Sequence, residues 1–193
     1  MILVRHGQSE FNVHFGATRQ DPGIRDAPLT DLGWAQARFA GKRMQDLGLT
    51  RLVISPYTRT LQTAAGILET LDVPVTIDHR IGERAWFTCD IGTPTSQLKT
   101  HWPHIVFDHL DEEWWPTDED DASLTHRTQA FRSDHAGHDD WETTGCVTHW
   151  GVIRALTGIE VGNTAIVRFD PIVSTGATLH HSPENSDLGL LAS

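Results

Sequence analysis

Three short segments of the sequence place arginine or histidine at or shortly after the end of a run of apolar residues. Arg5 and His6 follow residues 2–4, Arg59 follows a second apolar run, and His149 ends a third. Arginine offers a fork of N–H donors that suits the oxygens of a phosphoryl group, and imidazole can bind or exchange protons near neutral pH. Brought together, two arginines and two histidines would form a cationic pocket whose natural occupant is a phosphoryl group.

The elements that position these segments are strands that alternate with helices. We expect strands at residues 2–5, 51–55, 73–78, 145–150, 164–169 and 176–181, and helices at 29–48, 57–71 and 151–158. Thr30 is placed to cap the first of these helices and Gly48 to end it. The alternation predicts a three-layer α/β/α sandwich with a mostly parallel central sheet. Ligands of such sheets bind at the carboxyl ends of the strands, where the three segments would meet.

The loops at these strand ends add a second source of attraction for an anion. The chain enters a helix shortly after His6, Ser55 and His149. The first turn of a helix presents unpaired N–H groups and the positive end of the helix dipole. We therefore expect all three junctions to help hold the same phosphoryl group.

Residues 86–141 interrupt the regular alternation, and we interpret them as an insertion within a single domain that spans residues 1–193. Between Thr100 and His126 this region has eight acidic residues and no lysine or arginine, and it contains three of the tryptophans, Trp102, Trp114 and Trp115. One interpretation is a lid-like region over the strand ends, which could also recognise a cationic part of the substrate. The other is a solvated acidic loop anchored by its tryptophans. The tail, residues 182–193, is expected to be poorly ordered.

The composition limits the classes of partner. A net charge of −11 argues against non-specific binding of nucleic acid, which needs a basic surface. No apolar run is long enough to cross a membrane. Cys89 and Cys146 fit neither a metal site nor a disulfide framework, so we expect a cytoplasmic protein. The expected partner is a small-molecule phosphate monoester, and the sequence does not predict the oligomeric state.

Five motifs, in this order, make the pattern specific: LVRHGQSEFN, PLTDLGWAQA, SPYTRTLQTA, RIGE and VTHWGVIRAL. In this order they resemble the histidine phosphatase superfamily, which includes cofactor-dependent phosphoglycerate mutases and many acid and sugar-phosphate phosphatases. The resemblance covers roughly residues 1–84 and 145–158 and leaves the insertion outside it.

The resemblance implies a role for each matching residue. His6 would be the nucleophile and would form a phosphohistidine intermediate, while Glu83 in RIGE would donate a proton to the leaving group. The remaining implied contacts to the phosphoryl oxygens come from Arg5, Arg59, His149 and Asn12. Nucleophilic attack requires an unprotonated ring nitrogen on His6, and neighbouring arginines disfavour the imidazolium form. The implied chemistry needs neither a metal nor a cofactor.

Three residues near these motifs have more than one interpretation. Glu83 could instead form a surface ion pair with Arg84. Ser9 could contact the substrate, although capping of the following helix is its more ordinary role. Trp150 departs from the resemblance, because a small residue usually follows the second histidine. Its ring would either crowd the pocket or form an aromatic wall for the organic part of the substrate.

The sequence favours hydrolysis through a phosphohistidine on a small phosphorylated metabolite. A phosphoglycerate mutase would also bind a carboxylate, for which the acidic stretch offers no basic residue. A catalytically silent member that senses phosphate is a further alternative. A metal-dependent hydrolase is another, because the insertion is rich in histidine at His101, His104, His109, His135 and His138.

Overall fold

Six strands form one sheet in the computed structural model, which describes residues 1–173 and 177–181. The strands are β1 (Ile2–Arg5), β2 (Arg51–Ile54), β3 (Val75–Ile77), β4 (Thr144–Thr148), β5 (Ile166–Arg168) and β6 (Thr178–His181), in the order β3-β2-β4-β1-β5-β6. The pairs among β3, β2, β4 and β1 are parallel, whereas β5 and β6 continue the sheet antiparallel. The predicted mostly parallel sheet is confirmed.

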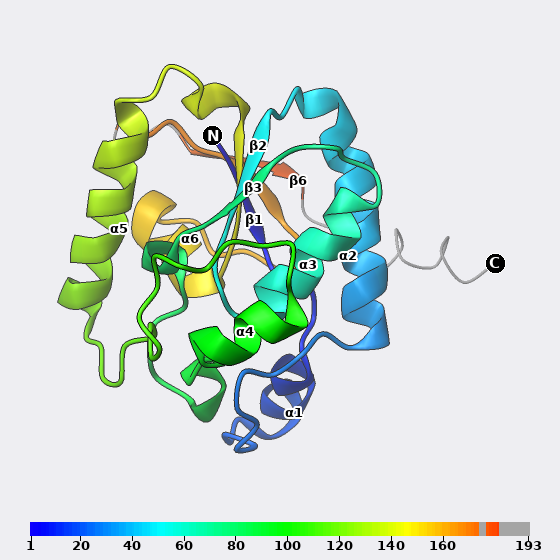
Figure 1. Cartoon of the computed structure of the whole chain (residues 1–193), viewed down its shortest axis with the longest axis vertical. Coiled ribbons are helices and arrows are strands. Elements are labelled where there is room, and N and C mark those ends of the chain that lie inside the picture. Colours follow the sequence, from blue (N-terminus) through cyan, green and yellow to red (C-terminus); the bar gives the residue numbers. More distant parts are fainter. Residues whose placement is uncertain (174–176, 182–193) are drawn as a thin grey trace.

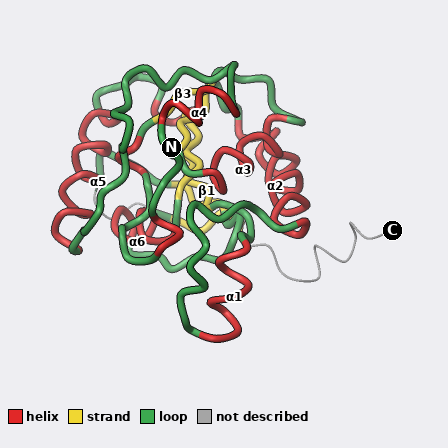
Figure 2. The backbone as a smooth tube through the Cα atoms, turned by 60° about the horizontal axis from the view of Figure 1, so that its bottom comes forward, coloured by secondary structure: helices red, strands yellow, loops and turns green. Residues whose placement is uncertain are grey.

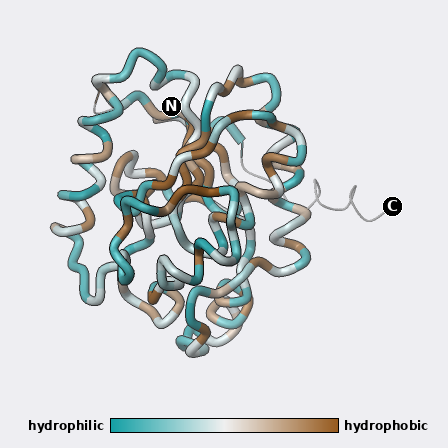
Figure 3. The backbone as a smooth tube through the Cα atoms, viewed as in Figure 1, coloured by the Kyte–Doolittle hydropathy of each residue, from teal (hydrophilic) through white to brown (hydrophobic). Residues whose placement is uncertain are grey.

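Helices cover both faces of this sheet (Figures 1 and 2). One face packs against α2 (Asp31–Met44) and α3 (Thr58–Leu68), and the other against α5 (Asp121–Ala136) and α6 (Trp150–Thr157). Alternate residues of β1 serve the two faces, because Ile2 and Val4 join the first cluster and Leu3 joins the second. Figure 3 shows the apolar strands between more polar helices. The predicted three-layer sandwich is therefore confirmed.

Local capping explains where the helices begin near the carboxyl ends of the strands. Ser9 caps α1 (Glu10–Thr18): its hydroxyl accepts from the backbone N–H of Asn12, whose side chain accepts from the backbone N–H of Ser9. The Thr30 hydroxyl accepts from the N–H of Gly33 at 3.0 Å, so the predicted cap of α2 is confirmed. Gly48 has φ of 66°, which suits a glycine that ends a helix.

The first part of the predicted insertion is anchored by buried aromatic residues. It contains α4 (Thr95–His101), and Phe107, Trp114 and Trp115 are buried in the same cluster as α2 and α3. The indole N–H of Trp114 donates to the carbonyl of Thr93, and its ring lies 4.7 Å from that of Tyr57. The interpretation of an acidic loop held down by tryptophans fits this part of the chain.

The second part of the predicted insertion is a regular helix of the sandwich. Asp120 caps α5, and Leu124 and Phe131 bury their side chains in the cluster that also contains α6. The structure thus divides residues 86–141 into an irregular segment followed by a layer helix. The sequence analysis did not predict α5, because the other residues of this helix are mostly polar or small and form no apolar stripe.

Three further expectations concern cysteines, metals and membranes. Cys89 and Cys146 are both buried free thiols. Within residues 1–173 and 177–181, no three histidine, cysteine or acidic side chains gather as metal ligands. In the same part of the chain, no helix has the length and apolar character to cross a membrane. The tail that was expected to be poorly ordered lies outside the described residues.

Candidate active site

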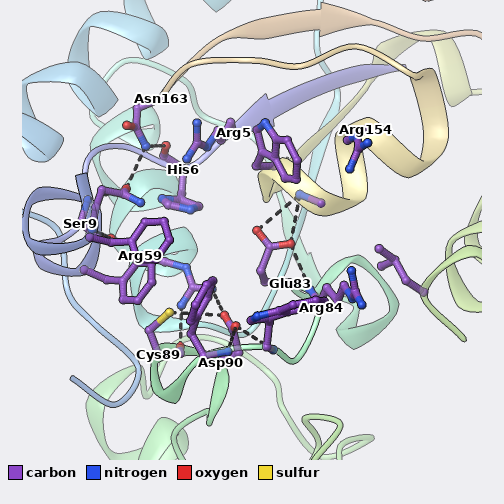
Figure 4. Close-up of a pocket in the computed structure, with 18 of the residues that line it drawn as sticks. Arg5, His6, Ser9, Arg59, Glu83, Arg84, Cys89, Asp90, Arg154 and Asn163 are labelled. Carbon is purple, nitrogen blue, oxygen red and sulfur yellow. Dashed lines mark hydrogen bonds and ion pairs between the residues drawn. The ribbon is translucent and has the colours of Figure 1, made fainter. Parts of the chain in front are cut away.

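A cavity of about 790 Å³ opens at the carboxyl ends of the parallel strands (Figure 4). Strand β1 delivers Arg5 and His6 to it, the first turn of α3 delivers Arg59, and the segment after β3 delivers Glu83. The predicted site residues that line this cavity are Arg5, His6, Ser9, Asn12, Arg59, Glu83 and Trp150. His149 is fully buried, with its ring centroid 5.2 Å from that of His6.

His6 is held as a neutral imidazole. Its Nδ1 lies 2.7 Å from the carbonyl oxygen of Gly7, and because a carbonyl only accepts, Nδ1 carries the proton. Burial, with further effect from Arg59 and Arg5, holds the pKa of His6 well below its ordinary value. The other nitrogen, Nε2, therefore keeps its lone pair. The backbone is fixed as well, since the His6 N–H donates to the carbonyl of Thr148 at 2.9 Å.

The loop after His6 packs tightly against the start of α2, and two glycines allow this. A Cβ on Gly7 would lie 2.5 Å from the carbonyl oxygen of Gly33, and one on Gly33 would lie 2.1 Å from that of Gln8. The amide of Gly7 also donates to the hydroxyl of Thr63 at 3.0 Å. The RHG and LTDLG motifs are thus parts of one backbone contact that fixes the position of His6.

His149 is the second neutral imidazole of the site. Its Nε2 lies 2.8 Å from the hydroxyl of Ser55, at the end of β2. Burial is the main cause that holds the pKa of His149 well below its ordinary value, with Arg59 and His6 acting in the same direction. Its Nδ1 is buried and has no hydrogen-bond partner among the residues that the structure describes.

One guanidinium nitrogen of Arg5 has a hydrogen-bond partner and another has none among the described residues. Its Nη1 donates to the carbonyl of Val161 at 2.7 Å, while its buried Nε finds no partner within the described part of the chain. A buried polar atom without a partner costs about 1–3 kcal/mol. Two such nitrogens, on Arg5 and His149, belong to neighbours of His6.

Arg59 is oriented by a residue that the sequence analysis missed. Its guanidinium donates to the carbonyl of Cys89 at 2.8 Å and to the carboxylate of Asp90 at 3.1 Å, and both members of this ion pair are 3% exposed. The second oxygen of Asp90 accepts from the N–H groups of Trp86 and Phe87. Asp90 follows no recognisable motif, so nothing in the sequence distinguished it from the other acids of the insertion.

Glu83 lies against the N-terminus of α6 rather than in a surface ion pair. Its Oε1 accepts from the N–H of Gly151 and from that of Arg84, both at 3.0 Å. A Cβ on Gly151 would lie 2.3 Å from this oxygen, so a larger residue here would displace the carboxyl group of Glu83 from its present position. The side chain of Arg84 pairs with Asp121 instead. Burial and then the charge of Asp90 raise the pKa of Glu83, which favours its protonated form.

An amide pair supports His6 from the other side. Asn163 donates to the carbonyl of His6 and to Oδ1 of Asn12, each at 3.1 Å. The oxygen of Asn12 also accepts from the N–H of Ser9, so only its amide nitrogen can donate to a bound group. Asn163 was missed, because it stands in an irregular segment before β5 with no pattern around it. Figure 4 shows Asn163 beside His6.

Trp150 lines the cavity at the first position of α6. Arg154, one turn later, lies over the indole ring with its guanidinium carbon 5.1 Å from the ring centroid. His149 nevertheless keeps its hydrogen bond to Ser55. The large residue after the second histidine is thus accommodated by the helix, and the Gly151 that follows provides the close approach to Glu83.

Comparison with known proteins assigns the family. The sequence pattern of the histidine phosphatase superfamily (branch 1) matches residues 1–170. The chain belongs to this superfamily, whose members act as phosphatases or mutases.

Two curated relatives carry mutase names. A probable phosphoglycerate mutase GpmB from Proteus mirabilis is 32% identical over 133 residues, which is 67% of this chain and 60% of the relative. A 2,3-bisphosphoglycerate-dependent phosphoglycerate mutase from Methylobacterium sp. is 42% identical over 89 residues, 44% of this chain and 41% of the relative. The chain thus spans less than two thirds of the length of these relatives.

Two solved structures with the same fold carry phosphatase names. A mycobacterial glucosyl-3-phosphoglycerate phosphatase, in complex with VO3, superposes with a TM-score of 0.62 at 21% identity, over 94% of this chain and 97% of that one. Phosphoserine phosphatase from Entamoeba histolytica, in complex with 3-phosphoglyceric acid, gives 0.62 at 22% identity, over 97% and 98%. At these identities the comparison establishes the shared fold alone.

Proposed function

We propose that this protein hydrolyses phosphate monoesters through a phosphohistidine formed on His6. One observation carries the proposal: a buried neutral imidazole, with Nδ1 committed to the carbonyl of Gly7, lies among Arg5, Arg59 and His149 at the base of the cavity. A lone pair surrounded by cationic and N–H donors is the arrangement that phosphoryl transfer requires.

Binding of the phosphoryl group would satisfy the unpaired donors of the site. Its non-bridging oxygens would accept from Nε of Arg5, from the guanidinium of Arg59 and from Nδ1 of His149. This requires the tautomer of His149 in which Nδ1 carries the proton and Nε2 accepts from the hydroxyl of Ser55. Because Asp90 and the carbonyls of the site already fix the arginines, little reorganisation accompanies the reaction.

The first chemical step transfers the phosphoryl group to His6. The lone pair of Nε2 attacks phosphorus, the ester P–O bond breaks, and its electron pair goes to the oxygen of the alcohol. Glu83, whose pKa is raised by burial and by Asp90, gives that oxygen its proton. The alcohol leaves, and the phosphoryl group remains on nitrogen.

The second step regenerates the imidazole. Glu83, now a carboxylate, takes a proton from a water molecule whose oxygen attacks phosphorus. The P–N bond breaks, its electron pair returns to Nε2, and inorganic phosphate leaves. The same carboxyl group therefore acts as the acid in the first step and as the base in the second.

A phosphoglycerate mutase is the second candidate, favoured by the names of the curated relatives and by Arg19 and Arg154 in the cavity lining. A mutase returns the phosphoryl group to a bound hydroxy acid instead of water. Hydrolysis remains our proposal because the acidic stretch between Thr100 and His126 brings Asp121, Leu124 and Thr125 to the cavity lining and no lysine or arginine, and Arg154 already has Glu160 within 3.7 Å.

The experiment is a measurement of phosphate release from an aryl phosphate and a panel of metabolite monoesters. Native protein and His6→Ala are compared with and without a chelator, and 3-phosphoglycerate with 2,3-bisphosphoglycerate is assayed for isomerisation. We expect phosphate release by the native protein and none by the variant. Isomerisation without release of phosphate would favour a mutase. Loss of activity in the presence of chelator would favour a metal-dependent hydrolase. Phosphate binding without turnover would favour a catalytically silent sensor.

A further inference from the structure

The outer part of the cavity is more aromatic than the wall that one interpretation of Trp150 predicted. Phe11 and Phe15, one turn apart on α1, stack with ring centroids 5.2 Å apart. Phe87, from the irregular segment after Glu83, lies 5.1 Å from Phe11 and 4.9 Å from Phe15. All three rings line the cavity. They form one wall that joins two segments far apart in the sequence.

A second apolar wall comes from α5 and α6. Trp150, Leu124 and Ala155 line the cavity from these helices. Leu124 is buried in the sandwich core, which fixes its side of the wall. At the rim, Trp86 is 63% exposed. Aromatic and aliphatic groups therefore line the cavity from α1 and the segment after Glu83 and also from α5 and α6.

Most charged side chains of the outer cavity already have partners. Arg84 pairs with Asp121, donates to the carbonyl of Glu119, and lies over the ring of Trp86 with its guanidinium carbon 4.1 Å from the centroid. Arg154 lies over Trp150. Each guanidinium lies over an indole ring and also has a carboxylate within 4 Å, Asp121 for Arg84 and Glu160 for Arg154. A charged group of a bound molecule would have to share or replace these contacts.

From these walls we propose that the alcohol part of the substrate is apolar, either a flat ring or an alkyl chain of several carbons, and not a short hydroxy acid. This inference rests on the proposed function, because it assigns the leaving group of the same reaction. The phosphoryl group would lie at His6, and the apolar part would lie between the wall of Phe15 and Phe87 and the wall of Trp150.

The test is a series of n-alkyl phosphates from ethyl to hexyl phosphate, with O-phosphoserine as the polar comparison. Straight-chain alcohols differ little as leaving groups, so the chemical step stays nearly constant along the series. Burial of each added methylene should raise kcat/KM about three- to fourfold until the walls are covered. O-phosphoserine should be no better than ethyl phosphate.

Two matched variants locate the effect. Phe15→Ala removes a ring of the proposed wall, and Phe39→Ala removes a partly exposed ring from α2, outside the cavity lining. We expect the dependence on chain length to flatten in Phe15→Ala and to keep the native slope in Phe39→Ala. Equal slopes in both variants would overturn the assignment of this wall.

The outcomes separate this inference from the function on which it rests. If the native protein releases phosphate from every alkyl ester at the same kcat/KM, or prefers O-phosphoserine, the apolar leaving group is wrong and the phosphatase stands. If it releases phosphate from none of the esters, including an aryl phosphate, the proposed function itself fails.

Discussion

The two ends of the cavity are built in different ways. At the inner end, His6, Arg59 and His149 are each at most 3% exposed and are held by hydrogen bonds to backbone carbonyls, a carboxylate or a hydroxyl. At the outer end, Phe15 and Trp86 are held by ring packing on an exposed helix and an irregular segment. The inner end is fixed by directional bonds, and the outer end by contacts that tolerate other shapes.

Under the proposed function, this difference separates the residues that carry out the reaction from those that select the substrate. Groups that stabilise transferring charge must already point at it, which explains why the sheet and helix ends hold the inner residues. Groups that contact the organic part of a substrate can come from loops and an exposed helix, where substitutions alter shape without disturbing the core. We therefore expect variants at the inner end to affect all esters, and variants at the outer end to affect some more than others.

Glu83→Gln should cause the largest loss of activity. It also tests whether a residue of the inner end affects esters differently according to their leaving group. On alkyl phosphates, loss of the proton donor should lower kcat/KM about 10²- to 10⁴-fold, because an alkoxide is a poor leaving group. On an aryl phosphate whose leaving group needs no proton, the first step should be far less affected. The values of kcat/KM, which report the reaction up to release of the alcohol, are compared on both esters with those of Glu113→Gln, the same change at an exposed position. Equal losses of kcat/KM on the two esters would remove Glu83 from the acid role.

Arg59→Met should lower kcat on every ester by a similar factor, about 10²- to 10³-fold, because it removes a donor to the transferring group. It also leaves Asp90 buried without its partner, so the free energy of unfolding should fall. Adding Asp90→Asn should restore part of the stability and none of the activity. A loss that depends strongly on the length of the alkyl chain would contradict the separation of the two ends.

The smallest effect concerns stability and pH. Buried neutral His6 and His149 have pKa values below the ordinary 6.5, so on acidification the unfolded chain takes up protons that the folded chain does not. The contribution of these two histidines to the free energy of unfolding is complete above about pH 6.5 and declines as the pH falls below that value. His149→Gln should make that decline less steep by up to about 1.4 kcal/mol per pH unit. Urea unfolding at several pH values measures it, and parallel curves for both proteins would contradict it.

The inner end was largely predictable from the sequence. Arg5, His6 and His149 stand immediately after apolar runs, and parallel strands bring their carboxyl ends to one edge of the sheet. The caps Ser9 and Thr30 were recognisable because a hydroxyl before a helix accepts from the first turn. These features are local in the sequence, and the sheet then assembles them.

The rest depends on contacts between distant segments. Asp90 acquires its role only because the irregular segment folds back onto α3, and Asn163 only because β5 returns beside β1. Phe11 and Phe15 have the spacing of an ordinary core face, and their place in a cavity wall follows from Phe87 packing on them. Helix α5 has too few apolar residues to be recognised before its neighbours are known.

The most direct measurement of the central claim is to trap the phosphoryl group on the protein. In Glu83→Gln with an aryl phosphate, transfer to nitrogen needs no acid, whereas hydrolysis has lost its base, so the intermediate should accumulate. After rapid quenching at alkaline pH, peptide mass spectrometry should find one phosphoryl group on His6 and none in the double variant with His6→Ala. A phosphoryl group on another residue, or release of phosphate that persists without His6, would contradict the account.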